Sequence, residues 1–290
     1  MGLKEECREI LSAHAALYVV PTPIGNLRDV TLRALDVLGQ ADLVLCEDTR
    51  RTRKLFARYG ISRPLVSCER FSEARRIDYV LSRLEEGSRV ALVSDAGTPT
   101  VSDPGSRLVR QVRNAGFPVV VLPGPSAVVT AFAASGIEGP FRFMGFAPRK
   151  KAELDAFIAG ILSSIESTVF YESPRRTAAT LGVLAARDSG RYVCVGREIT
   201  KIHEEYIAGC AIHVLQRLSR VEVKGEVTVV VEGSSHGQAS TSKSVDTAAR
   251  RLVRLGVPVR EVSAVLSELM GIPRNDIYRA VLAIRAEERS

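Results

Sequence analysis

The chain has 290 residues, of which 46% are hydrophobic and 25% charged, and this balance is typical of a soluble globular protein with room for two domains and a small third. It contains no apolar run of about 18 residues, so no membrane span is expected, and its acidic N-terminus lacks the apolar core of a secretory signal. Five scattered cysteines without CxxC spacing predict reduced thiols in a cytoplasmic protein, and the four histidines form no metal-ligand pattern.

The first half of the chain alternates apolar runs with helical patterns, after a short N-terminal extension at residues 1–15. Strands are predicted at 17–20, 43–46, 65–67, 90–94 and 119–122. Helices are predicted at 31–39, 50–59, 72–86, 104–115 and 126–134, and Thr31 and Ser72 stand where helix N-caps belong. This rhythm predicts that residues 16–136 form an α/β lobe around a mainly parallel sheet.

The segment SGIEGP at 135–140 breaks the rhythm and is typical of an interdomain linker. A second α/β lobe is predicted at 137–233. Its strands are expected near 141–146, 167–172, 192–199, 204–208 and 226–232, and its helices near 151–164 and 174–187. The short polar turn between the third and fourth of these strands predicts an antiparallel hairpin, hence a mixed sheet. Residues 233–244 have the composition of a flexible linker, and 245–290 are expected to form a small helical appendage.

Three strand-to-helix loops carry the polar residues that a ligand site needs: SDAGTP at 94–99, PGPSA at 123–127 and PTPIGN at 21–26. In an open α/β sheet, ligands bind where loops leave the carboxyl ends of the strands, so these loops are expected to converge. The phosphate-binding patterns GxxxxGK[ST] and GxGxxG are both missing, which favours a polar ligand without phosphates, such as S-adenosylmethionine. The alternative is that the loops are only well-formed turns and helix caps.

Seven blocks follow one another in the chain: VPTPIGNLRDVTLRAL, CEDTRRT, VSDAGTPTVSDPG, LPGPSA, FYESPRR, REITK and KGEVTVVVEG. In these blocks the chain resembles the ribosomal RNA small-subunit methyltransferase I family, a group of tetrapyrrole-methylase-type, or class III, S-adenosylmethionine methyltransferases. The resemblance covers about residues 16 to 286. It implies 2′-O-methylation of a cytidine ribose in small-subunit (16S) ribosomal RNA near the decoding centre. It also implies a bilobed fold with the cofactor between the lobes, and a homodimer that acts on the RNA or on the assembled 30S subunit.

The resemblance also implies which residues bind the cofactor: Pro23, Ile24, Asp95, Ala96, Gly97, Thr98, Val101, Ser126, Ala127, Glu172 and Thr200. The chain departs from the family at three places. Family members often have a His-rich segment at 68–73, an aromatic residue at Ser106 and a histidine at Arg176. These departures leave the cofactor loops intact and concern the side that faces RNA.

Methyl transfer to a ribose hydroxyl needs positioning and a base or charge near the oxygen. No histidine has suitable neighbours, so the polar candidates are Glu47 and Asp48 in CEDTRR, and Glu198 and Lys201 in REITK. The lysine would stabilise the developing alkoxide, or act as the base if burial lowers its pKa. A structural ion pair is the alternative for each of them.

The net charge of +7 is concentrated in two places that are expected to bind RNA phosphates. The basic residues are Arg50, Arg51, Arg53, Lys54, Arg149, Lys150 and Lys151. A solvated helix face would explain either cluster without RNA. For the whole protein, the rival functions are a small-molecule, tetrapyrrole-type methyltransferase and a non-catalytic RNA-binding module. The lone Gly25 in the first loop and the basic clusters favour RNA, and the intact cofactor blocks favour an enzyme.

Overall fold

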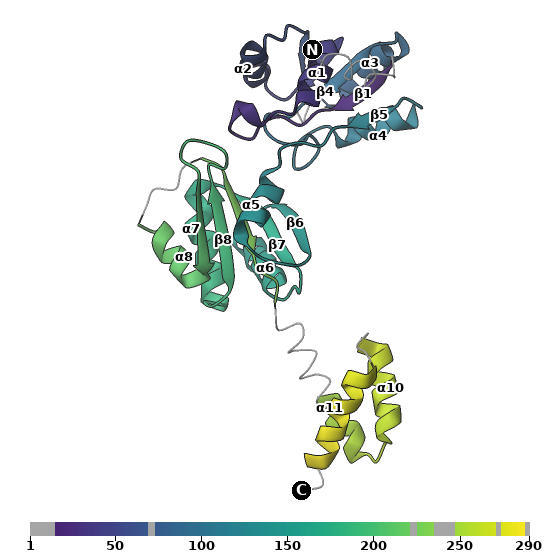
Figure 1. Cartoon of the computed structure of the whole chain (residues 1–290), viewed down its shortest axis with the longest axis vertical. Coiled ribbons are helices and arrows are strands. Elements are labelled where there is room, and N and C mark those ends of the chain that lie inside the picture. Colours follow the sequence, from purple (N-terminus) through teal and green to yellow (C-terminus); the bar gives the residue numbers. More distant parts are fainter. Residues whose placement is uncertain (1–14, 69–72, 221–224, 235–246, 271–273, 288–290) are drawn as a thin grey trace, which may run out of the picture.

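A computed structural model of the chain describes residues 15–68, 73–220, 225–234, 247–270 and 274–287 (Figure 1). The predicted extension at 1–15 lies outside the described residues except for its last position, and so do Ser72 and most of the predicted linker at 233–244. The described part contains two five-stranded sheets, one after the other along the chain, followed by a group of helices.

The first sheet is fully parallel and has the strand order β3-β2-β4-β1-β5. Its strands are β1 (Ala16–Val19), β2 (Leu43–Cys46), β3 (Leu65–Ser67), β4 (Arg89–Leu92) and β5 (Val119–Val121). The connecting helices are η2 (Leu27–Asp29), α1 (Leu32–Gln40), α2 (Thr49–Tyr59), α3 (Glu73–Glu85) and α4 (Ser106–Asn114). The expected parallel α/β unit is therefore confirmed.

Helices cover both faces of this sheet because successive strand residues point to opposite sides. Tyr18 on β1 packs with α1 and α2 on one face, whereas its neighbour Leu17 packs with α3 and α4 on the other. Strands that are buried on both faces read as continuous apolar runs, which is why they are visible in the sequence. Thr31 caps α1 as expected, since its hydroxyl accepts a hydrogen bond of 3.0 Å from the Ala34 N–H.

The second sheet is mixed and has the order β6-β7-β10-β8-β9, in which only β6 and β7 run parallel. Its strands are β6 (Phe141–Phe146), β7 (Ser167–Glu172), β8 (Tyr192–Arg197), β9 (Glu205–Cys210) and β10 (Val227–Val231). The expected hairpin is β8 and β9, which pair antiparallel. One face carries α6 (Lys151–Leu162), α7 (Pro174–Arg187) and α8 (Ala211–Leu218), the last of which the sequence analysis missed.

Helix α5 (Ala127–Ser135) packs on the other face of the second sheet, although the sequence analysis placed it in the first lobe. Val128 and Ala131 join Val169 and Val230 in one buried cluster. The helix is apolar on nearly all sides, so its sequence pattern does not indicate which sheet it covers. By packing, α5 therefore belongs with the second sheet.

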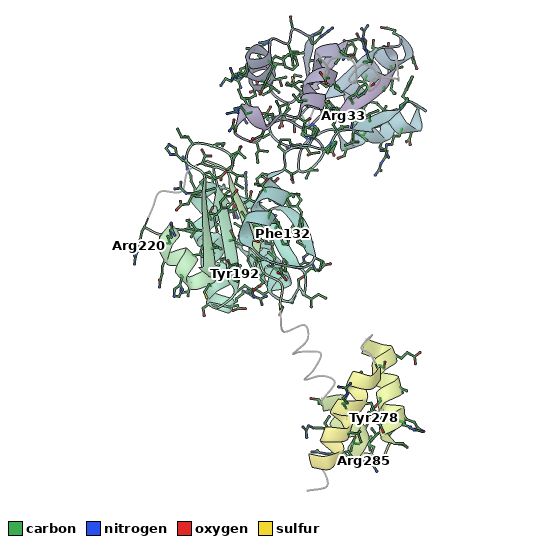
Figure 2. The ribbon with its side chains drawn as sticks, viewed as in Figure 1. Arg33, Phe132, Tyr192, Arg220, Tyr278 and Arg285 are labelled. Atoms are coloured by element: carbon green, nitrogen blue, oxygen red, sulfur yellow. The ribbon has the colours of Figure 1, made fainter. Side chains whose placement is uncertain are left out.

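The described C-terminal residues form helices at 247–254, α10 (Val259–Met270) and α11 (Arg274–Glu287). Their buried side chains, among them Val262, Leu266 and Val281, form a small apolar cluster of their own. Figure 2 places Tyr278 and Arg285 on this unit, Arg33 on the first sheet unit, and Phe132 and Tyr192 on the second. None of the helices in the described segments has the length and apolarity that crossing a bilayer requires.

Candidate functional site

A cavity of about 690 Å³ lies where the carboxyl ends of the first sheet meet the second sheet unit. The loops after β1, β2, β4 and β5 line one side, and the ends of β6 and β7 with the start of β10 line the other. Among the lining residues are Ile24, Glu47, Arg51, Asp95, Ala96, Gly97, Thr98, Val101, Asp103, Ser126, Ala127, Phe146, Tyr171, Glu172 and Glu226. The predicted convergence of the strand-end loops is therefore found in the structure.

The loops after β1 and β4 are joined by backbone hydrogen bonds. The N–H groups of Thr22 and Gly97 each donate to the carbonyl of the other residue at 2.9 Å. The Thr22 hydroxyl, which is buried, donates to the Ser94 carbonyl at 3.0 Å. These bonds fix the SDAGTP loop against the first loop, so that side of the cavity has a defined shape.

Asp95 connects the β4 loop to the start of α2. One carboxylate oxygen accepts a 2.9 Å hydrogen bond from the Asp48 N–H, and the other pairs with Arg51 Nε at 3.3 Å. Burial raises the pKa of Asp95 in spite of these favourable contacts. Asp48 itself caps α2 and pairs with Arg50 at 2.7 Å, and the hydrogen bonds from Arg50 lower the pKa of Asp48 to about 2.

The REITK loop contacts the first loop at Gly25. The Asn26 N–H donates to the Thr200 hydroxyl at 3.0 Å. A Cβ at Gly25 would lie 2.6 Å from both the Thr200 hydroxyl and Lys201 Cγ, so only glycine allows this approach. Thr200 therefore holds the two loops together and does not line the cavity.

Lys201 lies between two carboxylates, with its Nζ 2.8 Å from Glu198 and 3.2 Å from Glu226. Burial acts to lower the pKa of Lys201, but the hydrogen bonds and charges of Glu198 and Glu226 outweigh it and raise the pKa. The hypothesis that burial turns Lys201 into a base is therefore wrong, because the group is held as a cation.

Glu172 is buried, and its own chain uses both of its carboxylate oxygens. One accepts from the Ser173 N–H at 2.7 Å and the other from the Thr180 hydroxyl at 2.6 Å. Arg176 pairs with it at 3.4 Å and also donates to the carbonyls of residues 147 and 148. Arg176, one of the departures from the family, thus ties β7 to the segment that follows β6.

The lining of the cavity is acidic, although the chain as a whole is basic. Among the described residues that line it, Arg51 is the only cation, and the acids are Glu47, Asp95, Asp103, Glu172 and Glu226. Burial, followed by the charge of Glu47, raises the pKa of Asp103 to about 6. Burial and the charge of Asp103 raise the pKa of Tyr171 to about 12. This lining suits a ligand with positive charge.

The structure brings most of the predicted cofactor residues to the cavity, namely Ile24, Asp95, Ala96, Gly97, Thr98, Val101, Ser126, Ala127 and Glu172. Pro23 and Thr200 lie outside its lining, and so do the predicted catalytic residues Asp48, Glu198 and Lys201. Sequence reasoning missed Asp103 and Tyr171. The block VSDPG and the motif FYES already contained them, but no pattern distinguished them from turn and strand residues.

The predicted RNA-binding residues are exposed at two places. Arg53 and Lys54 lie on α2, and for them the described residues show no ion pair, whereas Arg50 and Arg51 are paired with Asp48 and Asp95. Arg149 and Lys150 lie between β6 and α6, and Lys151 is the first residue of α6; Lys150 pairs with Glu153 at 3.0 Å. Within the described segments, no group of histidine, cysteine and acidic side chains is arranged to hold a metal ion.

The fold and the cavity define a class of protein. Residues 16–211 match the family described as tetrapyrrole (corrin/porphyrin) methylases. Among solved structures, cobalt precorrin-4 methyltransferase covers 76% of this chain and 95% of its own with a TM-score of 0.58 at 18% identity. Diphthine synthase covers 75% and 90% with a TM-score of 0.56 at 16% identity. At these identities the likeness shows the fold alone.

Curated relatives give a narrower assignment. The ribosomal RNA small subunit methyltransferase I of Micromonospora olivasterospora is 44% identical over 280 residues, which cover 94% of this chain and 88% of the relative. The protein of the same name from Escherichia coli O157:H7 is 38% identical over 93% of this chain and 96% of its own. The chain therefore belongs to the ribosomal RNA small subunit methyltransferase I family, as the seven blocks indicated.

Proposed function

We propose that this protein uses S-adenosylmethionine to methylate the ribose 2′-hydroxyl of a cytidine in small-subunit ribosomal RNA. The observation that carries the proposal is the acidic cavity at the strand ends of a basic chain that belongs to this family. The names of the relatives support ribosomal RNA as the substrate. The cytidine, the 2′-oxygen and the homodimer follow from the resemblance, the cytoplasmic location follows from the cysteine pattern, and all four stay predictions.

The cavity fits the proposed cofactor in size and charge. Its volume of about 690 Å³ lies within the range of sites for small organic ligands. The excess of carboxylates in the lining suits a sulfonium cation, and the hydroxyls of Thr98 and Ser126 offer polar contacts for a ribose or an amino-acid group. The residues that would hold the cofactor are therefore Ile24, Asp95, Ala96, Gly97, Thr98, Val101, Ser126 and Ala127. When bound, it supplies a methyl group that is already activated.

The RNA backbone would lie outside this acidic cavity, where exposed cations gather. Arg53 and Lys54 lie on α2, and Arg51 of the same helix lines the cavity. Arg149 and Lys151 follow Phe146, which lines the opposite side. Cations on both sides of the opening would hold phosphates while one nucleotide enters the cavity.

Methyl transfer from labelled S-adenosylmethionine to 30S subunits, naked 16S RNA and free tetrapyrroles tests the substrate. We expect the label in RNA, at a nucleotide whose adjacent phosphodiester resists alkaline cleavage because that cleavage needs a free 2′-hydroxyl. Label in tetrapyrroles alone would support the rival small-molecule function. Label on a base, next to an alkali-labile bond, would contradict the 2′-oxygen as the acceptor.

A pair of glycine variants tests the cofactor site. Gly97 and Gly116 both have positive φ, at 80° and 83°, but a Cβ meets Ile24 and Pro125 at Gly97 and nothing within 4 Å at Gly116. Leucine therefore imposes similar backbone strain at both positions and adds bulk to the cavity only at Gly97. Calorimetry is expected to show lost cofactor binding in Gly97→Leu and retained binding in Gly116→Leu. Equal affinities in the two variants would refute this site.

A further inference from the structure

Asp103 reaches the cavity from a loop with unusual backbone geometry. It lies between the end of β4 and the start of α4, and its carboxyl is half-buried in the lining. Thr100 and Ser102, just before it, have φ values of 75° and 67°, which side-chain-bearing residues rarely adopt. Each such residue costs about 1 kcal/mol or more, and such strain gathers at functional sites. The unusual backbone conformations of Thr100 and Ser102 thus lie in the loop that brings Asp103 into the lining of the cavity.

The groups around Asp103 come from three elements of the first sheet unit and two of the second. Glu47, from the loop after β2, and Asp95, from the loop after β4, act on it through their negative charges, and the Ser94 hydroxyl forms a hydrogen bond with it. Arg51 on α2 is paired with Asp95. On the opposite side of the cavity lies Tyr171, at the end of β7. Burial, followed by the charges of Asp103 and Glu226, raises the pKa of Tyr171. Burial, followed by the negative charges of Glu47 and Asp95, raises the pKa of Asp103 to about 6.

We infer that Asp103 is the catalytic residue that accepts the proton of the ribose 2′-hydroxyl during methyl transfer. The inference rests on the proposed function. As the 2′-oxygen forms its bond to the methyl carbon, the carbon–sulfur bond breaks and its electron pair stays on sulfur. The hydroxyl proton passes to a carboxylate oxygen of Asp103, so the products are a neutral ether and a neutral thioether. Atoms and charges balance without a further reactant.

Asp48 and Glu198, the two carboxylates predicted from the sequence to be catalytic, fit this role less well. Hydrogen bonds from Arg50 lower the pKa of Asp48 to about 2, which makes it a weak proton acceptor. Glu198 is paired with Lys201, and the hydrogen bond from Lys201 lowers the pKa of Glu198. Neither residue lines the cavity. Asp103 is in the cavity, and a proton acceptor whose pKa lies near the working pH is the most effective kind.

Single-turnover methylation of 30S subunits by the full chain tests the inference. The wild-type rate is expected to rise with pH through an inflection near pH 6 and then level off. Asp103→Asn keeps the shape of the side chain and is expected to lower the plateau rate by about 100-fold or more. Calorimetry sets the S-adenosylmethionine concentration that saturates each protein, because the loss of one carboxylate from the acidic lining weakens the attraction for the sulfonium cation. The control is Asp78→Asn, which replaces an exposed carboxylate on α3 and should leave rate and affinity unchanged.

The raised pKa is also measurable without catalysis. The fold favours the protonated form of Asp103, so between about pH 4 and pH 7 this group binds more protons in the folded than in the unfolded state, and its contribution to wild-type stability falls as the pH rises. As the pH rises through this range, the urea midpoint of Asp103→Asn should therefore rise relative to that of wild type. At higher pH the difference between the two midpoints should stay constant. Asp78→Asn should track wild type throughout.

The outcomes distinguish a failure of the proposed function from a failure of the role inferred for Asp103. A wild-type enzyme that transfers no methyl group to RNA overturns the proposed function and this inference with it. A wild-type enzyme that is active, while Asp103→Asn keeps its rate within about threefold, overturns only the inference. So does a loss of rate that a loss of cofactor affinity fully explains. If Asp103→Asn does not fold, the wild-type pH profile decides, because a flat profile through pH 6 also overturns the inference.

Discussion

Glu172 shows how a side chain can line a cavity and still be occupied by its own fold. Its carboxylate accepts hydrogen bonds from the Ser173 N–H and the Thr180 hydroxyl and pairs with Arg176, so little of it is free for a ligand. The resemblance implies that Glu172 contacts the cofactor. The structure supports a different role for the side chain itself, which fixes the end of β7 and so positions the neighbouring Tyr171.

Replacing Glu172 by alanine is therefore expected to reduce stability. The change leaves the buried Thr180 hydroxyl and the Ser173 N–H without their acceptor and removes the carboxylate that pairs with Arg176, and breaking a buried pair costs roughly 3–5 kcal/mol. Urea unfolding measures the effect. Glu166→Ala, at an exposed position just before β7, is the control and should change stability by less than about 0.5 kcal/mol. Equal losses in both variants would contradict the positioning role.

Phe146 is a second residue whose role follows from its position. It ends β6, is 66% exposed, lines the cavity and has its ring centroid 5.2 Å from that of Tyr171. Exposed aromatic rings at RNA sites stack on unpaired bases. On the proposed function, Phe146→Ala should raise the KM for 30S subunits roughly tenfold, because stacking contributes about 1–3 kcal/mol per base. Cofactor affinity should stay constant, and Phe146→Trp should restore KM. An unchanged KM in the alanine variant would rule out stacking.

At the scale of elements, the contact between the first loop and the REITK loop depends on the small size of Gly25. A Cβ there would lie 2.8 Å from the Ile199 carbonyl as well as against Thr200 and Lys201. Gly25→Ala should therefore separate the two loops, break the bond from Asn26 to Thr200 and cost roughly 1–3 kcal/mol. Urea unfolding and cofactor calorimetry give the measurement. Gly39→Ala in α1 adds the same methyl group in open space and should be neutral or stabilising, so parallel losses would argue against the clash.

The elements that the sequence predicted are those with a clear local signal. The central strands β1, β2 and β4 of the first sheet are buried on both faces and appear as apolar runs, and Thr31 marks the start of α1 with a cap. Helix α8 was missed because it begins directly where β9 ends at Cys210, with no loop between them. The position of α5 was wrong because its residues are apolar on nearly all sides. The cofactor loops were visible from their turn chemistry, whereas the raised pKa of Asp103 depends on its burial and on the charge of Glu47, which lies far away in sequence.

At the scale of the whole molecule, charge is divided between an acidic cavity and basic helical surfaces. Replacing Arg53 and Lys54 by serine removes two exposed cations from α2 and leaves the ion pair between Arg51 and Asp95 at the cavity in place. On the proposed function this variant should reduce the log–log salt slope of RNA binding by roughly one unit per lost contact. The matched control removes Arg107 and Arg110 from α4, on the other face of the first sheet, and should keep the slope. If both variants change the salt slope of RNA binding equally, the net charge of the protein explains the binding, and α2 does not contact the RNA specifically.

The packing of α5 also determines where this chain can be recombined with a relative. The helix follows the PGPSA loop of the first sheet unit, but it buries Val128 and Ala131 against the second sheet and so belongs to the second unit by packing (Figure 1). A chimaera spliced after residue 136 would pair the α5 of one parent with the sheet of the other and disturb a close-packed interface. A crossover before Ser126 transfers the helix together with the strands it covers. Chimaeras of two members of this family should therefore fold when they are joined before Ser126 and fail to fold when they are joined after residue 136.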